Sequence, residues 1–232
     1  MSSTFAPVVS HGARAAEQRL VALFRDGEWP TDRVWLRRRS DRNPFISANV
    51  VLILEQCRTS EPALPTLMDA VLGEELKVKA LAYRYHQARD FLFLGRGANY
   101  PTALEGAHKL KELSYSHAEG TAAGEMKHGI NALIDDQLPV VAIALRDSTY
   151  KKMRSNMQEV RARAGVVIAL ANDDDLEIAD HADEVIRIPH TNDLIAPALA
   201  VLPLHLFAYH VADRRGNDVD QPRNLAKSVT VE

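Results

Sequence analysis

The sequence contains little of what marks several classes of protein. Cys57 is the only cysteine, so no disulfide can form within the chain, and a reducing cytoplasm is the expected location. No segment approaches the roughly 20 apolar residues that span a bilayer. The first residues also lack the basic start and long apolar run of a signal peptide. A formal net charge of −3 over 232 residues gives no reason to expect nucleic acid or a membrane surface as a partner.

Motifs that define metal sites and common catalytic sites by their spacing are missing as well. The sequence has no Walker loop and no G-x-S-x-G turn. The triplets HAE at 117–119 and KHG at 127–129 do not have the spacing of zinc ligands. We therefore expect neither a bound metal nor a cofactor.

Regular hydrophobic periodicity begins near residue 61. Residues 1–60 are polar and broken by Pro30 and Pro44, and we leave them as an N-terminal extension without an assigned domain. Apolar residues then recur at helical spacing from Leu64, which predicts a helix that continues to Tyr85. Four later runs have the length and composition of buried strands: 91–95, 139–145, 166–171 and 184–189. Helical segments alternate with them at about 101–117, 149–164 and 193–213. This alternation predicts an α/β fold in which helices cover both faces of a parallel sheet.

Ligands of such sheets bind beyond the carboxyl ends of the strands. The expected ends are Gly95, Leu145 and Ala171 with the loops that follow them. The turn GRGANY at 95–100 could bring backbone amides to an anion, and it fits an ordinary tight turn between a strand and a helix equally well.

A polar stripe runs along the helix that follows the first strand. Glu105, Lys109 and Glu112 are spaced i, i+4 and i+7, and therefore share one face of the helix. Spacing alone favours surface ion pairs worth a few tenths of a kcal/mol. The alternative is an active-site face, and the position of the stripe supports it, because we expect the helix that follows the first strand to place it close to the ligand edge of the sheet.

Two further segments carry candidate chemistry. Residues 116–129, SHAEGTAAGEMKHG, are small and glycine-rich, which predicts a loop pressed against a ligand or another subunit, with His128 near its end. The C-terminal tail after Asp213 has little periodicity but keeps apolar residues, which predicts a packed segment. A packed Lys227 would lose its proton more readily and could attack a carbonyl, whereas composition favours an exposed lysine.

These segments together resemble one family. The stretches LFLGRGANYPTALEGAHKLKELSYSHAEGTAAGEMKHG (92–129) and DVDQPRNLAKSVTVE (218–232) are similar to the isomerase part of glucosamine-6-phosphate synthases, the glutamine–fructose-6-phosphate aminotransferases (isomerizing). The resemblance covers about residues 62–232 and corresponds to the second of two sugar isomerase (SIS) domains. It implies a three-layer α/β/α SIS domain over residues 61–232, with a parallel, flavodoxin-like sheet and a C-terminal active-site tail.

The resemblance also implies roles for individual residues. Glu112 would shuttle a proton between C1 and C2 of fructose 6-phosphate, His128 would assist ring opening in the site of a neighbouring subunit, and Lys227 would form a Schiff base with the open ketose. Glu105 and Lys109 match supporting residues, and the backbone of Ala226 matches a sugar contact. The product would be glucosamine 6-phosphate. The implied partner is a second copy of the chain, or a chain that supplies the other SIS domain.

Several departures from the family pattern limit this expectation. The chain begins Met1-Ser2-Ser3 instead of with the cysteine of a glutaminase domain, and no stretch matches the SQSGET-type loop that grips the sugar phosphate. EGTAAGE stands where the family has EAYAAGE, and HGIN where it has HGPL. We therefore expect little or no synthase activity from this chain by itself. The alternatives are a non-catalytic SIS module that binds a sugar phosphate, a truncated gene remnant, and a deglycase-like SIS enzyme.

Overall fold

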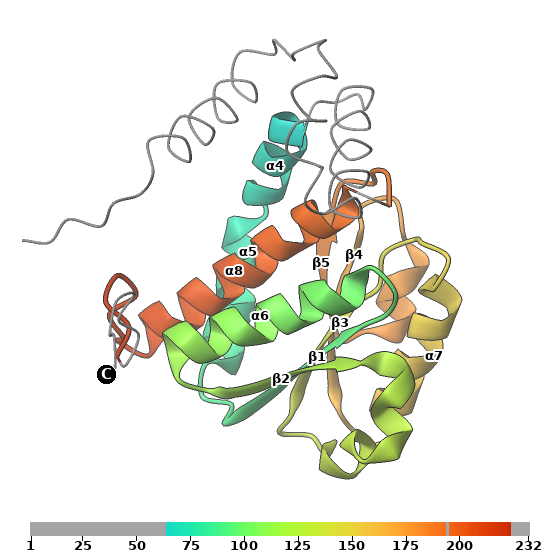
Figure 1. Cartoon of the computed structure of the whole chain (residues 1–232), viewed down its shortest axis with the longest axis horizontal. Helices are drawn as coiled ribbons and strands as arrows, with labels where there is room; N and C mark the ends of the chain where they lie inside the picture. Colours follow the sequence, from blue (N-terminus) through green and yellow to red (C-terminus); the bar gives the residue numbers. More distant parts are fainter. Residues whose placement is uncertain (1–63, 194, 224–232) are drawn as a thin grey trace, which may run out of the picture. The chain divides into compact units, whose positions relative to one another are not determined.

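A five-stranded parallel sheet forms the centre of the structure, a computed structural model that describes residues 64–193 and 195–223. The strands are β1 (Asp90–Gly95), β2 (His117–Ala122), β3 (Pro139–Ile143), β4 (Val166–Asn172) and β5 (Glu184–Ile188). Their order across the sheet is β2-β1-β3-β4-β5 (Figure 1). This is the flavodoxin-like order, so the predicted sheet is confirmed.

Helices cover both faces of this sheet, as predicted. One face carries α4 (Leu64–Leu72), α5 (Glu75–Tyr85), α6 (Asn99–Ser114) and α8 (Ala196–Arg214). The other face carries α7 (Tyr150–Arg161) with the short 3₁₀ helices η1 (Ala123–His128) and η3 (Glu177–His181), while η2 (Ile130–Leu133) follows η1. Figure 1 shows α6 and α8 crossing one side of the strands, with α7 on the far side.

The alternation of side chains along each strand explains the two layers. In β1, Phe91 and Phe93 join the core beneath α6 and α8, whereas Leu92 and Leu94 join the core beneath α7. The ring of Phe91 packs edge-on against Phe207 of α8, with the two centroids 5.9 Å apart. Because both faces are buried, each central strand reads as a continuous apolar run, which is the pattern that revealed it.

The helix expected between Leu64 and Tyr85 is interrupted. It forms α4 and α5, and the chain turns at Gly73, whose N–H donates to the carbonyl of Asp69 at 3.0 Å. The other three predicted helices are present with ends shifted by one to three residues.

The prediction of a loop over residues 116–129 is wrong for the first half of this segment. His117–Ala122 form β2, an edge strand that pairs in parallel with all of β1. Helix α6 crosses this strand so closely that a Cβ atom on Gly120 would lie 2.7 Å from the Cα of Leu104. Small residues are therefore required by the packing of a helix on an edge strand, and they conceal the alternation that normally reveals a strand.

Across the described residues, no helix is both long enough and apolar enough to cross a membrane.

Candidate active site

The predicted polar stripe forms a connected set of charged groups on the outer face of α6. The ammonium of Lys109 donates to Glu112 Oε2 at 2.7 Å and lies 3.9 Å from Glu105 Oε1. His108, which sequence analysis did not single out, places its Nε2 2.9 Å from Glu112 Oε1. Both carboxylate oxygens of Glu112 thus have a nitrogen partner. The opposite face of the helix, with Ala103, Ala107 and Leu110, is buried as expected.

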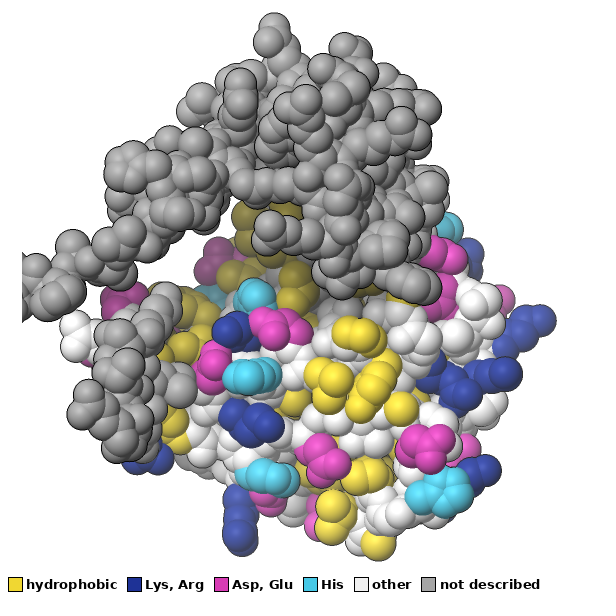
Figure 2. Space-filling model, in the orientation of Figure 1, with side chains coloured by type: hydrophobic (Ala, Val, Ile, Leu, Met, Phe, Trp, Pro, Cys, Tyr) yellow, Lys and Arg dark blue, Asp and Glu magenta, His cyan; other side chains and the backbone are white. Residues whose placement is uncertain are grey.

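A histidine from a distant part of the chain extends this set. His205 of α8 places its Nε2 3.1 Å from Glu105 Oε1, one hundred residues away in sequence. In Figure 2, acidic, basic and histidine side chains gather over the area that α6 and α8 occupy in Figure 1. Spacing along one helix cannot reveal such a contact, because the packing of α6 on α8 creates it.

The hydrogen bond between Lys109 and Glu112 shifts the pKa of both groups. It holds the pKa of the Glu112 carboxyl below its ordinary value, with further lowering from the nearby charges of Lys109 and His108. The same bond raises the pKa of Lys109. Glu112 is therefore ionised at neutral pH, which is the state in which a carboxylate can accept a proton.

Lys109→Met should raise the pKa of Glu112 toward the ordinary value for glutamate. A carboxyl with a lowered folded-state pKa stabilises the fold above its unfolded-state pKa, and this contribution is lost as pH falls through the folded-state pKa. The variant should therefore lose less stability than the unmodified protein as the pH falls below about 4, where the unfolded-state carboxyl becomes protonated. Carbon-detected NMR titration of the glutamate carboxyls measures the shift directly.

Lys111→Met is the matched control, because Lys111 lies on the same helix and is exposed. Equal pKa changes in the two variants would show that general charge removal, and not the hydrogen bond from Lys109, sets the pKa of Glu112.

The stripe does not lie at the carboxyl edge of the sheet, so our expectation of its position is wrong for Glu112. Helix α6 begins at Asn99, directly after the carboxyl end of β1, and runs back along the strand. Glu112 is in its last turn, about 20 Å from Asn99 at 1.5 Å per residue.

The carboxyl edge itself holds a small cleft of about 100 Å³. The loops that follow β1, β3 and β4 contribute to its lining, including Asn99, Arg146 and Asn172. Asn99 donates from Nδ2 to Asp147 Oδ2 at 3.0 Å across the gap between β1 and β3. Leu145 and part of the predicted turn at 95–100 line this cleft, whereas the described candidates for catalysis, Glu105, Lys109, Glu112 and His128, do not.

The chain that follows α8 is fixed to the end of α6 that carries Glu112 (Figure 1). Arg215 donates to three backbone carbonyls, of His86 at 2.6 Å, Ala88 at 2.7 Å and Ser114 at 3.1 Å. Asn217 donates to the carbonyl of Leu113 at 3.0 Å. Hydrogen bonds therefore anchor the start of the tail to α6, whereas the apolar residues on which the predicted packing rests, at 225–231, lie outside the described residues.

Tyr115 contacts Arg223, which is the last described residue before the predicted nucleophile, Lys227. The backbone N–H of Arg223 donates to the Tyr115 hydroxyl at 2.9 Å, and the Arg223 guanidinium lies over the tyrosine ring, 4.1 Å from its centroid. Tyr115 ends α6 with a left-handed backbone, at φ 58°, three residues after Glu112. Ala226 and Lys227 lie outside the described residues. Lys227 comes four positions after Arg223, so their Cα atoms lie at most about 14 Å apart.

Tyr115→Ala should expose the bond after Arg223 to trypsin, because both contacts that hold Arg223 are removed. We expect cleavage there to become several-fold faster, with Tyr115→Phe intermediate because it keeps the ring and loses the hydroxyl. The initial rate of appearance of the C-terminal peptide, followed by mass spectrometry, measures the effect. Tyr209→Ala, which removes a half-exposed tyrosine of α8, is the control. Unchanged cleavage in Tyr115→Ala would show that Tyr115 does not hold the tail.

His128 lies at the other end of β2 from Glu112. It is the last residue of η1, it is exposed, and the nearest acidic group recorded for it is Glu125, 3.8 Å away. Strand β2 begins three residues after α6 ends and extends about 20 Å before η1 begins. One chain therefore brings together Glu105, Lys109 and Glu112 but does not bring His128 to them.

Comparison with known proteins decides the family. Residues 84–212, more than half of the chain, match the SIS domain family. The chain belongs to the SIS domain family. This SIS domain is 58% identical over 169 residues to the glutamine–fructose-6-phosphate aminotransferase (isomerizing) of Thermus thermophilus, a match that covers 73% of this chain and 28% of that protein. It is 49% identical to the same enzyme of Thermosynechococcus vestitus over 199 residues, which covers 85% of this chain and 30% of that protein.

A solved structure agrees with these sequence matches. The C-terminal domain of glucosamine-fructose-6-phosphate aminotransferase from Francisella tularensis superimposes with a TM-score of 0.63 at 38% identity, covering 67% of this chain and 44% of that one. The predicted resemblance to the isomerase part of this enzyme family is therefore confirmed. The SIS domain chain spans less than a third of the length of the curated relatives that it matches.

Proposed function

We propose that this chain provides the isomerase portion of a glutamine–fructose-6-phosphate aminotransferase, acting on fructose 6-phosphate to give glucosamine 6-phosphate in the cytoplasm. The observation that carries the proposal is the contact between Arg223 and Tyr115. It holds the segment that leads to Lys227 beside the last turn of α6, where Glu112 lies. This contact supports a site in which the carboxylate of Glu112 and the amine of Lys227, far apart in sequence, act on one small substrate.

In the proposed reaction, the amine of Lys227 adds to the C2 carbonyl of the open ketose, and water leaves as the Schiff base forms. Ammonia then displaces the lysine at C2. Glu112 removes a proton from C1 and delivers it to C2, while the proton of the C1 hydroxyl passes to the imine nitrogen, which leaves an aldehyde at C1 and an amine at C2. The hydrogen bond from Lys109 to Glu112 supports this role, since it keeps the carboxylate ionised and fixes its orientation.

We propose that a second copy of the chain supplies His128. The residue is exposed at one end of β2, while Glu112 lies beyond the other end, and this separation supports exchange between two copies. In a symmetric dimer each copy would donate its histidine to the other. Ring opening needs a proton donor and acceptor near the ring oxygen, and imidazole can serve as both near neutral pH.

The chain by itself should form glucosamine 6-phosphate from fructose 6-phosphate and ammonia only very slowly. No stretch of the sequence matches the family's hydroxyl-rich phosphate loop. Each charge-assisted hydrogen bond of such a loop contributes roughly 1.5–3 kcal/mol, so several bonds amount to orders of magnitude in binding. Adding the first SIS domain of the Thermus thermophilus relative as a separate chain should raise the rate, provided that Glu112 is intact.

Rapid turnover by the purified chain alone would contradict the expected dependence on a phosphate loop. No gain in rate with the added domain, at concentrations where the two chains associate, would contradict the proposed function. The competing proposal, a module that binds a sugar phosphate without turnover, is supported by the same missing loop. It differs in needing no Schiff base at Lys227.

A further inference from the structure

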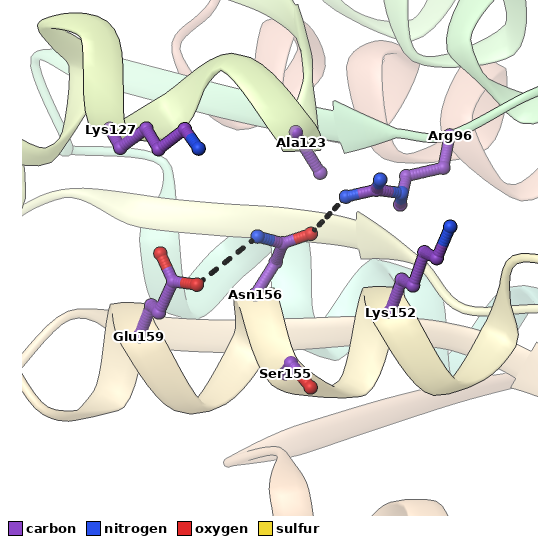
Figure 3. A pocket seen from close by; sticks show the side chains of 8 residues that line it. Arg96, Ala123, Lys127, Lys152, Ser155, Asn156 and Glu159 are labelled. Atoms are coloured by element: carbon purple, nitrogen blue, oxygen red, sulfur yellow. Dashed lines mark hydrogen bonds between the residues drawn. The ribbon is translucent and has the colours of Figure 1, made fainter.

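A second cleft, of about 290 Å³, lies between α7 and η1 on the face of the sheet opposite α6. It is lined by Arg96, Ala123, Gly124, Lys127, Lys152, Ser155, Asn156 and Glu159 (Figure 3). None of the described residues of the proposed active site contributes to its lining. Its volume is at the low end for ligand sites, which suits a small molecule.

Three cations from three separate elements meet at this cleft. Arg96 follows β1 directly, Lys127 belongs to η1, and Lys152 belongs to α7. In the described part of the chain no ion pair is recorded for any of the three, although many other arginines have a carboxylate partner, as Arg84 and Arg154 do. Glu159 is the only carboxylate in the lining, so the cleft carries two more positive charges than negative ones.

Neighbouring groups hold Arg96 in place. Arg96 Nη1 donates to Oδ1 of the buried Asn156 at 2.8 Å. A Cβ atom on Gly124 would lie 3.3 Å from both terminal guanidinium nitrogens, so glycine leaves the space that this side chain occupies. Figure 3 shows the Lys127 ammonium and the Arg96 guanidinium pointing into the space above Asn156 from opposite sides, and the Lys152 ammonium pointing toward Arg96.

We propose that this cleft binds the phosphate group of a small phosphorylated metabolite, at a site separate from the proposed active site. A phosphomonoester carries a charge of about −1.5 to −2 at neutral pH, which matches the excess positive charge of the cleft. The planar guanidinium of Arg96 suits two phosphate oxygens, and the two ammonium groups can contact the others. An anion would also relieve the repulsion among three like charges that Glu159 offsets only in part. The proposal extends beyond the proposed function, since it uses none of the same residues.

Titration of the 232-residue chain with inorganic phosphate at constant ionic strength tests the proposal, with backbone amide shifts as the readout. Saturable shifts are expected in η1 and in the first half of α7. Lys152→Gln should weaken phosphate binding about tenfold, because it removes one charge-assisted contact. Lys151→Gln, which makes the same change on the neighbouring exposed residue outside the cleft, should leave binding unchanged.

Two further variants locate the site. Arg146→Gln, in the cleft at the carboxyl edge, and Lys227→Ala should both keep the phosphate affinity of the unmodified chain. The proposal is overturned if no saturable shift occurs, if Lys151→Gln weakens binding as much as Lys152→Gln, or if Arg146→Gln abolishes binding. Phosphate binding at this cleft does not involve Lys227. The titration can therefore succeed or fail independently of the tests of the proposed active site.

Discussion

Replacing Lys227 with alanine is expected to abolish borohydride-dependent labelling of the chain by fructose 6-phosphate. If the lysine amine forms a Schiff base with the open ketose, borohydride reduces the imine to a stable secondary amine. The unmodified chain should gain the mass of one reduced ketose phosphate, and peptide mapping should place it on the segment that contains Lys227. High substrate concentration compensates for weak binding, because the trap is irreversible.

Lys111→Ala is the matched control, since it removes an exposed lysine near the same end of α6. It should be labelled like the unmodified chain. Equal labelling of Lys227→Ala, or labelling spread over surface lysines in both variants, would exclude a specific Schiff base. The protein would then fit the competing proposal of a non-catalytic sugar-phosphate-binding module.

Glu112→Gln is expected to slow the exchange of the C1 proton of fructose 6-phosphate with solvent by about 10²–10⁴-fold, the usual contribution of a general acid–base group. Glutamine keeps the size of the side chain but cannot accept the proton. The exchange requires neither ammonia nor glutamine, and deuterium incorporation at C1 measures it in D₂O. Labelling at Lys227 should persist in this variant, because Schiff base formation precedes the proton transfer.

Borohydride labelling and C1 proton exchange distinguish the role of Lys227 in forming the Schiff base from the role of Glu112 in proton transfer. Lys227→Ala should lose both labelling and exchange, whereas Glu112→Gln should lose exchange alone. Glu177→Gln, which removes an exposed carboxylate paired with Arg154, should change neither. Exchange at the unmodified rate in Glu112→Gln would remove this residue from the mechanism.

The sequence predicted four of the five strands and the arrangement of helices on both faces. Apolar runs of strand length between amphipathic helices can only be buried in such layers, so composition and length were sufficient. Strand β2 was missed because its residues satisfy a different requirement. Gly120 lies under the backbone of α6 at Leu104, and a larger side chain there would clash.

The candidate site was predictable only in part. The spacing of Glu105, Lys109 and Glu112 placed them on one helix face, but their roles came from the family resemblance. The expected location at the carboxyl edge failed for Glu112 because α6 carries it to the opposite end. His205 and Tyr115 could not have been found from local spacing, since each meets its partner only through the packing of α8 and the tail against α6.

Contacts of this kind explain why the tail has no periodicity of its own. Arg215 and Asn217 bond to backbone carbonyls of other segments, so their side chains need no regular spacing. A sequence pattern reports which face of a helix or strand is buried. It does not report a segment whose position depends on single hydrogen bonds to distant backbone groups.

The most direct test of the account is a crystal structure of the chain after borohydride reduction with fructose 6-phosphate. We expect the sugar on the Lys227 amine, with the Glu112 carboxylate within hydrogen-bond distance of both C1 and C2, and His128 of a second copy beside the ring oxygen. A reduced sugar on Lys227 with every Glu112 in the assembly beyond reach of C1 and C2 would contradict it.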